Sequence, residues 1–499
     1  MTAAVRRRWQ APARRRPSLP LHVGALSAAV PGVAMLVAAG VDRIDGGPDA
    51  GALLLCGLPT TVTGVVGWRS TRVPKEVRNL EVFVTVTLAW VTLAGVGALP
   101  YLATGRLSSI DLALFESVSG FTTTGATVLR PVAETSQGLL MYRALSQWIG
   151  GMGVIVLVIA VLPTVGSGAM NLMTAEAPGP SGERLTPRVR HTARNLWTIY
   201  VGFTVAVVAA YVAAGMSLFD GLAHGFTTVS TGGFSPHNAS LAHFDSAAVE
   251  WIAIAAMFLA GGSFALYYRA LRGEPAPLLR SSEFRAYGIV VLTAVAVMFV
   301  VGDADAPPGE HLRDSFFAIT SVVSTTGFTT ADFGGWSQGA QIVIMLLLPI
   351  GAMAGSTAGG VKMVRVLAVA SYAHRSALSQ LHPRLVRPVR VGSRALPEEI
   401  ATRIVGFMVL ALVVFGGGAV LIALTGPDMI TSFSAAASSF GNVGPGLGDV
   451  GPTGDYLALP WVARVVTMVQ MLLGRLEIYP VMLALSVFTL RRRLHPARD

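Results

Sequence analysis

Four short clusters of serine, threonine and glycine carry the residues best suited to chemistry. Each cluster ends a semi-apolar segment too short to cross a bilayer, and these segments are 115–126, 222–233, 317–328 and 434–445. Aligning the last glycine that they share superposes Gly125, Gly232, Gly327 and Gly444. Because glycine adopts backbone conformations closed to other residues, successive carbonyl groups of each loop can turn toward a common axis.

Four such loops around one axis form a ring of carbonyl oxygens that can replace the hydration shell of a monovalent cation. The side chains beside these carbonyls belong to Thr123, Thr124, Ser230, Thr231, Thr325, Thr326, Asn442 and Val443. The helix before each loop directs its partly negative C-terminal end inward, which also favours a cation. A single cluster of this kind indicates only a turn or a close helix contact. Four such clusters, each at the end of a short segment between two apolar spans, predict an ion-binding selectivity filter.

The elements that must position these loops are membrane-spanning helices. The chain of 499 residues is 53% hydrophobic and 13% charged, and its mean hydropathy is +0.61. About ten apolar runs are long enough to span the hydrocarbon core, namely 21–40, 50–68, 82–102, 139–165, 196–218, 251–268, 286–301, 341–370, 404–424 and 461–490. The runs at 341–370 and 461–490 are interrupted. A half-span that ends in irregular backbone must line a water-filled path, because lipid offers its amides no partner.

The charged residues predict the orientation of the chain. The formal net charge is +10, and the basic clusters at 6–16, 69–78, 184–194, 269–285, 375–394 and 491–493 fall on alternate loops. This alternation is the cytoplasmic bias of basic loops, so we interpret the charge as topological and expect no nucleic-acid partner. It predicts a multi-pass inner-membrane protein with both termini in the cytoplasm. A cleaved N-terminal signal peptide would leave an odd number of spans.

A glycine-rich break divides the span that follows the third cluster. Its small residues are Gly351, Gly355, Ser356, Thr357, Gly359 and Gly360, and helix is weak at such a composition. A flexible segment inside a pore-lining span can block the conduction path and withdraw, so we interpret 351–360 as a gate loop. Tight helix packing through small residues is the alternative. A phosphate-binding loop is excluded, because Val361 stands where that motif requires lysine.

The motifs together resemble the Trk/Ktr/HKT superfamily of potassium transporters, and within it the longer TrkH-like members. The resemblance covers nearly the whole chain and is carried by SGFTTTGATVL (119–129), QWIGGMGVIVL (147–157), AEAPGP (175–180), FTTVSTGGFS (226–235), STTGFTTADF (324–333), AGSTAGGVK (354–362), NVGPGLG (442–448) and GRLEIYPV (474–481). It implies an all-α membrane protein with four M1-P-M2 pore-loop repeats in pseudo-fourfold arrangement. We expect two extra N-terminal helices in 1–78 and repeats in 79–190, 191–281, 282–395 and 396–499.

The resemblance also implies the cargo and the partners. Family members with four filter glycines prefer potassium, whereas a serine at the first such position goes with sodium permeation. We therefore expect the filter residues to bind K⁺ as the transported ion, with no organic cofactor. A homodimer in membrane lipid and a cytosolic nucleotide-binding regulatory subunit (TrkA-like) are further expectations.

Arg475 is a charge within the last apolar run, where a buried charge is costly and usually functional. In the resembling family its counterpart faces the pore just below the filter, where it would repel the permeating ion and restrain the gate loop. The alternative is a structural ion pair, although Glu477 is too near in sequence to share its helical face. Ala352 and Met353 replace the small residues more usual in the family's gate loop and bear on its stiffness.

Other classes of membrane protein fit less well. A secondary transporter of another fold would show inverted repeats and helices broken at the midplane, whereas these four clusters share one orientation. An intramembrane enzyme would need a paired acid and base, a metal cluster or an activated nucleophile, and the spans contain no such motif. A sodium-permeable or sodium-coupled transporter of the same fold stays open.

Overall fold

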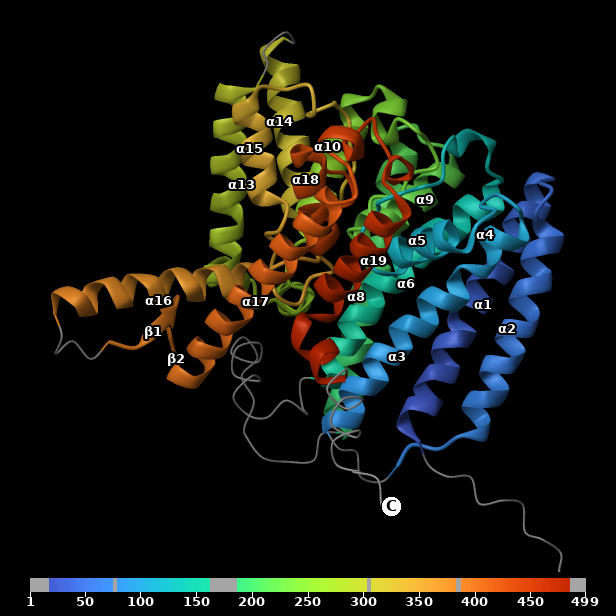
Figure 1. The fold of residues 1–499 in the computed structure, drawn as a ribbon, viewed down its shortest axis with the longest axis horizontal. Coiled ribbons are helices and arrows are strands. Elements are labelled where there is room, and N and C mark those ends of the chain that lie inside the picture. The colour runs from blue at the N-terminus through green and yellow to red at the C-terminus, as the bar shows by residue number, and fades with distance from the viewer. Residues whose placement is uncertain (1–17, 75–78, 162–185, 303–306, 383–386, 485–499) are drawn as a thin grey trace, which may run out of the picture.

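The computed structural model describes residues 18–74, 79–161, 186–302, 307–382 and 387–484, and this part of the chain is predominantly helical (Figure 1). The basic residues at 6–16, 75, 78, 184 and 491–493 and the AEAPGP motif at 175–180 lie outside the described residues. The N-terminal elements are α1 (Leu19–Asp45), α2 (Ala50–Ser70), α3 (Asn79–Gly97), α4 (Leu99–Ala103), α5 (Ile110–Phe121), η1 (Val132–Glu134) and α6 (Gln137–Val161).

The described middle part of the chain is also helical. Its elements are α8 (Thr186–Ala213), α9 (Leu218–Val229), η3 (Ser240–Phe244), α10 (Ala247–Ala260), α11 (Phe264–Leu271), α12 (Ala276–Arg280), α13 (Ser282–Val301), α14 (Pro308–Val323), α15 (Gln338–Leu347) and α16 (Met363–Leu381). The C-terminal elements are β1 (Val389–Val391), β2 (Arg394–Leu396), α17 (Glu398–Ala423), α18 (Met429–Gly441), η4 (Gly448–Val450), η5 (Tyr456–Ala458) and α19 (Trp461–Leu476). The two strands pair antiparallel, with Arg390 opposite Ala395.

Helices occupy all ten of the predicted apolar runs. Within the described residues, six helices are long and apolar enough to cross a membrane by themselves, and two bent helix pairs pass the same test. The interruption expected in 461–490 lies at Glu477, where α19 turns by 108° into the helical segment Ile478–Ala484. The interruption expected in 341–370 is the loop between α15 and α16.

One predicted span, 251–268, differs from the continuous helix that we expected. It is broken between α10 and α11, whose axes differ by 100°. A Cβ atom at Gly261 would collide with the Tyr287 side chain, so glycine is the residue that fits at this bend. The backbone groups released by the break bond to the gate loop instead, since Gly261 O accepts from Met353 N and Phe264 N donates to Gly355 O.

Four helices of 12 to 16 residues carry the polar clusters at their C-terminal ends, and the mostly helical structure confirms the predicted fold class. They are α5, α9, α14 and α18, and we call them the pore helices. Side chains cap two of them, because Ser217 accepts from Asp220 N and Asp428 accepts from Thr431 N. These bonds satisfy N–H groups that a helix start leaves without an intrahelical partner.

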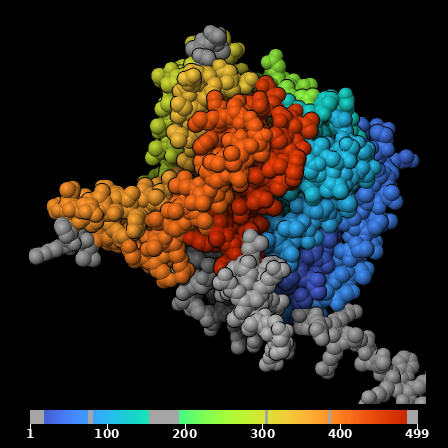
Figure 2. Space-filling model, in the orientation of Figure 1, coloured from blue at the N-terminus to red at the C-terminus, as the bar shows by residue number. Residues whose placement is uncertain are grey.

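The N-terminal helices α1 and α2 form a hairpin at one edge of the molecule (Figure 1). Small residues let the two helices approach closely, because a side chain at Gly32 would collide with Thr61 and one at Gly64 would collide with Ala29. At the opposite edge, α16 and the β-hairpin project from the body (Figure 2). The pore helices lie between these two edges.

Candidate functional site

Each pore helix ends in a loop with the same backbone conformation. One residue near the start of each loop has a positive φ, which is 54° at Thr123, 54° at Thr231, 60° at Thr325 and 56° at Asn442. Two residues later each loop has a glycine with positive φ, namely Gly125, Gly233, Gly327 and Gly444. This repeated pair of left-handed residues defines four filter loops, 122–125, 230–233, 324–327 and 441–444.

The second loop corrects the alignment made from sequence. The structural equivalent of Gly125 is Gly233, and Gly232 is the equivalent of Thr124. The backbone bonds agree, since Thr124 N donates to Ser119 O as Gly232 N donates to Thr227 O. Thr231, and not Ser230, therefore corresponds to Thr123. The shared dipeptide Gly-Phe, at 233–234 and 327–328, is the sequence signal that indicates the correct register.

The four loops contact one another in a closed cycle. A Cβ atom at Gly125 would collide with Gly232 O, one at Gly233 with Thr326 O, and one at Gly327 with Val443 O. The cycle closes at Gly444, whose Cβ would lie 2.6 Å from Thr124 O. Each glycine thus packs against a carbonyl oxygen of the neighbouring loop, and no other residue type fits in that space. This arrangement brings backbone carbonyl groups from all four repeats to one place.

Gln147 of α6 supports the second loop. Its Nε2 donates to Gly232 O at 2.6 Å, and its Oε1 accepts from Phe234 N at 3.0 Å. A Cβ atom at Gly232 would collide with this amide group. The Gln147 side chain therefore fills the space that side chains occupy at the equivalent positions Thr124, Thr326 and Val443.

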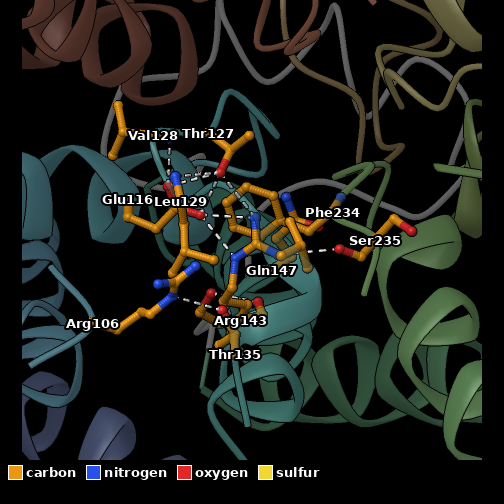
Figure 3. Close-up of polar contacts among 12 residues, drawn as sticks. Arg106, Glu116, Thr127, Val128, Leu129, Thr135, Arg143, Gln147, Phe234 and Ser235 are labelled. Atoms are coloured by element: carbon orange, nitrogen blue, oxygen red, sulfur yellow. Dashed lines mark hydrogen bonds and ion pairs between the residues drawn. The ribbon is translucent and has the colours of Figure 1, made fainter. Parts of the chain in front are cut away.

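A buried ion pair joins the first two loops, as Figure 3 shows. Glu116 on α5 and Arg143 on α6 lie 2.8 Å apart, and their side chains are 0% and 3% exposed. The Glu116 carboxylate also accepts from Val128 N at 2.9 Å. Arg143 donates to Ser235 O and lies over the Phe234 ring at 4.0 Å. This pair anchors the outer ends of both loops, and sequence reasoning did not identify Arg143.

We expect Glu116→Gln to lower the stability of the folded protein strongly. It leaves the Arg143 guanidinium buried without its carboxylate, and removing one partner of such a pair costs about 3 to 5 kcal/mol. Thermal melting of the purified protein measures the loss. Glu134→Gln is the matched control, because the pair Arg106–Glu134 is formed at 3.3 Å with Glu134 67% exposed, and exposed pairs contribute about 0 to 1 kcal/mol. Equal melting shifts in the two variants would contradict the anchoring role of Glu116.

The side chains at the second position of the loops, Thr123, Thr231, Thr325 and Asn442, differ in their partners. Within the described structure, the buried Oγ1 of Thr123 and Oδ1 of Asn442 have no hydrogen-bond partner. The Asn442 amide nitrogen donates to Thr124 Oγ1 and to Met471 O, both at 2.9 Å, and so links the fourth loop to the first. Buried oxygens without a protein donor are suitable ligands for a cation.

The gate loop 351–360 lies directly against the filter loops. Gly359 N donates to Thr325 Oγ1 at 2.8 Å, and Thr357 Oγ1 donates to Val229 O, the C-terminal residue of α9, at 3.0 Å. A Cβ atom at Gly359 would lie 2.6 Å from Gly441 O. The gate loop therefore contacts the third and fourth filter loops and the end of the second pore helix, α9. Ala352 and Met353 are fully buried and fix its first residues.

Arg475 connects the gate loop to the first repeat. Its Nη1 donates to Thr357 O at 2.6 Å and its Nη2 donates to Gly150 O at 3.3 Å. The side chain is buried, and its partners are carbonyl oxygens. Glu477 pairs with Arg365 at 2.6 Å, so the ion pair considered from sequence for Arg475 is formed by another arginine.

Comparisons with known proteins agree with this architecture. The family description TrkH, a cation transport protein, matches residues 58–287 and 289–491. The Trk system potassium uptake protein TrkH of Halomonas elongata is 38% identical over 416 residues, which are 82% of this chain and 85% of that protein. TrkI of the same organism is 33% identical over 96% of both chains. The crystal structure of the potassium transporter TrkH from Vibrio parahaemolyticus has a TM-score of 0.85 and 33% identity, over 93% of this chain and 97% of that one.

Proposed function

Because this chain belongs to the TrkH family of cation transport proteins, we propose that it takes up potassium ions through the ring of four filter loops. The observation that carries the proposal is the closed cycle in which each filter glycine packs against a carbonyl oxygen of the next loop. Such a ring offers backbone oxygens at fixed positions, and a dehydrated monovalent cation needs that kind of cage. The curated relatives are named as potassium uptake proteins.

Reversal potentials in liposomes that contain only the purified chain test this function. Under opposed potassium and sodium gradients, we expect the reversal potential to follow the potassium gradient. A potential that follows sodium equally would support the sodium-permeable alternative, and a flux that requires both ions would support coupled transport. A reversal potential that follows potassium supports a filter with four glycines. After the correction of the second loop, these are Gly125, Gly233, Gly327 and Gly444.

The gate loop and Arg475 supply the control of flux in this proposal. The loop contacts the third and fourth filter loops and the end of α9, and Arg475 adds a fixed positive charge beside it. A positive charge on the conduction path raises the electrostatic barrier for a cation. The conduction path opens when the gate loop and the Arg475 side chain move out of it.

A separate soluble subunit is expected to regulate this gate. The longest basic segment between spans, about 375–403, contains the end of α16, the β-hairpin and the start of α17. We propose that this face is cytoplasmic, together with both termini, and that a nucleotide-binding subunit docks there. Co-purification of such a subunit from native membranes is the expected result. Full nucleotide-responsive gating by this chain alone in liposomes would contradict it.

The proposed homodimer is tested on the same preparation. We expect the chain, purified in mild detergent, to elute with twice the mass of one chain when light scattering corrects for bound detergent. A mass of one chain would contradict the dimer without affecting the filter, because all four filter loops come from a single chain.

A further inference from the structure

Four arginine residues line a cavity of about 740 Å³ beside the first turn of α13. They come from separate elements: Arg269 from α11, Arg280 from α12, Arg285 from the first turn of α13 and Arg394 from β2. We call this cavity the arginine pocket. Four cationic residues around one space repel one another, and an anion bound there lowers that repulsion.

The described residues provide little compensation of this kind. Of the four arginines, only Arg269 forms an ion pair with a described carboxylate, Glu274, at 3.0 Å. Arg285 makes long bonds of 3.4 Å to the carbonyl oxygens of Ser281 and Arg280. The carboxylate that lines the pocket, Glu283, accepts hydrogen bonds from two backbone N–H groups. Among the described residues that line the pocket, four are arginines and one is a carboxylate, so the lining carries an excess of positive charge.

The chemistry of the pocket fits a phosphate group. Guanidinium groups bind phosphate oxygens in pairs with matched geometry, and the N-terminus of α13, a helix of 20 residues, adds the positive pole of its dipole. Because α13 is one of the long apolar helices, its basic end lies at the depth of lipid headgroups. Basic pockets between helices at this level bind anionic headgroups.

We propose that the arginine pocket binds a phosphate group, from an anionic phospholipid or from a soluble phosphate, and that its occupancy acts on the gate loop. The link is Glu283 in the pocket wall, whose Oε1 accepts from Ala354 N of the gate loop at 2.8 Å and from Val364 N of α16 at 3.0 Å. An anion that draws the arginines together shifts the start of α13 and with it both of these bonds. The effect on gating rests on the proposed function, but the binding does not.

Binding is measured on the full-length protein by thermal melting in two arms. The first compares nanodiscs of phosphatidylcholine with nanodiscs that also contain one-fifth phosphatidylglycerol. The second adds inorganic phosphate to the phosphatidylcholine nanodiscs, with chloride at equal ionic strength as reference. We expect a higher melting temperature in at least one arm. Stabilisation by phosphatidylglycerol alone assigns the lipid, stabilisation by phosphate assigns the soluble source, and no stabilisation in either arm overturns the proposal.

The double variant Arg280→Gln/Arg394→Gln tests the location of the site. We expect it to lose at least half of the stabilisation. Its matched control is Arg272→Gln/Arg403→Gln, which removes two exposed arginines that do not line the pocket and is expected to keep the full shift. Equal losses in the two variants would mean that general surface charge, and no specific pocket, holds the anion.

Ion flux with and without the same ligand tests the link to the gate. We expect occupancy to change the flux of the parent protein at least about threefold and to have no such effect on the Arg280→Gln/Arg394→Gln variant. Binding without any change in flux would overturn the link through Glu283 while the pocket stands. If the parent protein conducts no ions at all, the proposed function fails, and the melting experiment still decides whether the pocket binds phosphate.

Discussion

The Gly233→Ser variant is expected to lose at least about tenfold in its preference for potassium over sodium, which corresponds to about 1.4 kcal/mol. Gly233 has a φ of +76°, a conformation that side chains other than glycine rarely adopt, and its Cβ would collide with Thr326 O of the third loop. The serine forces this carbonyl out of the ring, so the cage no longer fits one cation better than the other. Reversal potentials in liposomes measure the ratio.

Gly232 provides the matched control, because it is the glycine that sequence alignment alone places in the ring. The three atoms nearest to a Cβ atom at Gly232 all belong to the Gln147 amide. We expect Gly232→Ser to disturb selectivity less than Gly233→Ser. Adding Gln147→Ala should restore the parent ratio, since the freed space then accepts the hydroxymethyl group. No second substitution can relieve the collision in Gly233→Ser in this way, because the three nearest atoms belong to the backbone of Thr326 and Gly327.

Two outcomes would contradict this assignment. One is an unchanged potassium preference in a Gly233→Ser protein that elutes as a folded species. The other is a loss of selectivity in Gly232→Ser that Gln147→Ala does not reverse. Either result would mean that the second loop meets the ion through a different residue from the one indicated by its φ angles.

The sequence was sufficient for the fold because its signals repeat. Apolar length marks the spans, and four clusters of the same composition mark the pore helices, so an error at one of them leaves the other three to define the architecture. The register of the second loop was wrong by one residue because the adjacent glycines of Ser-Thr-Gly-Gly offer two equivalent alignments. The positive φ of Gly233, the backbone hydrogen bonds and the following phenylalanine distinguish Gly233 from Gly232.

The contacts between repeats could not be predicted in the same way. Arg143 lies on an apolar helix with no local partner, and its carboxylate, Glu116, is 27 residues away on another element. Gln147 occupies a space that exists only because a residue 85 positions later lacks a side chain. The bend after α10 likewise depends on bonds to the distant gate loop. Each of these features is determined by tertiary packing, which local composition does not encode.

Arg475→Ala is expected to raise potassium flux at least about fivefold without changing selectivity. The substitution removes a positive charge whose repulsion of a nearby cation is on the order of a few kcal/mol in a wet pore. It also removes the hydrogen bond that holds Thr357 O of the gate loop. Arg464→Ala is the control on the same helix, because Arg464 pairs with Asp111 at 2.9 Å at the other end of α19 and should change flux less than twofold.

Deleting part of the gate loop should act in the same direction. The structure favours a deletion confined to Ala354, Gly355 and Ser356. Ala354 and Gly355 bond to α13 and α11, and Ser356 bonds within the loop to Met353 O. Thr357 and Gly359 bond instead to the end of α9 and to the third filter loop, and they are best left in place. The shortened loop cannot hold Thr357 beneath the ring, so flux rises, and the intact carbonyl cycle keeps the selectivity.

The double variant distinguishes a pure charge effect from a latch. If Arg475 acts only as a charge on the conduction path, its removal and the deletion multiply in their effects on flux. If it also holds the loop closed through Thr357 O, the two changes share one interaction and their combined effect is smaller than the product. We expect the smaller effect, because the guanidinium donates to the loop itself at 2.6 Å. Lower flux in the deletion, in a folded protein, would instead make the segment a structural hinge that keeps the filter loops in place.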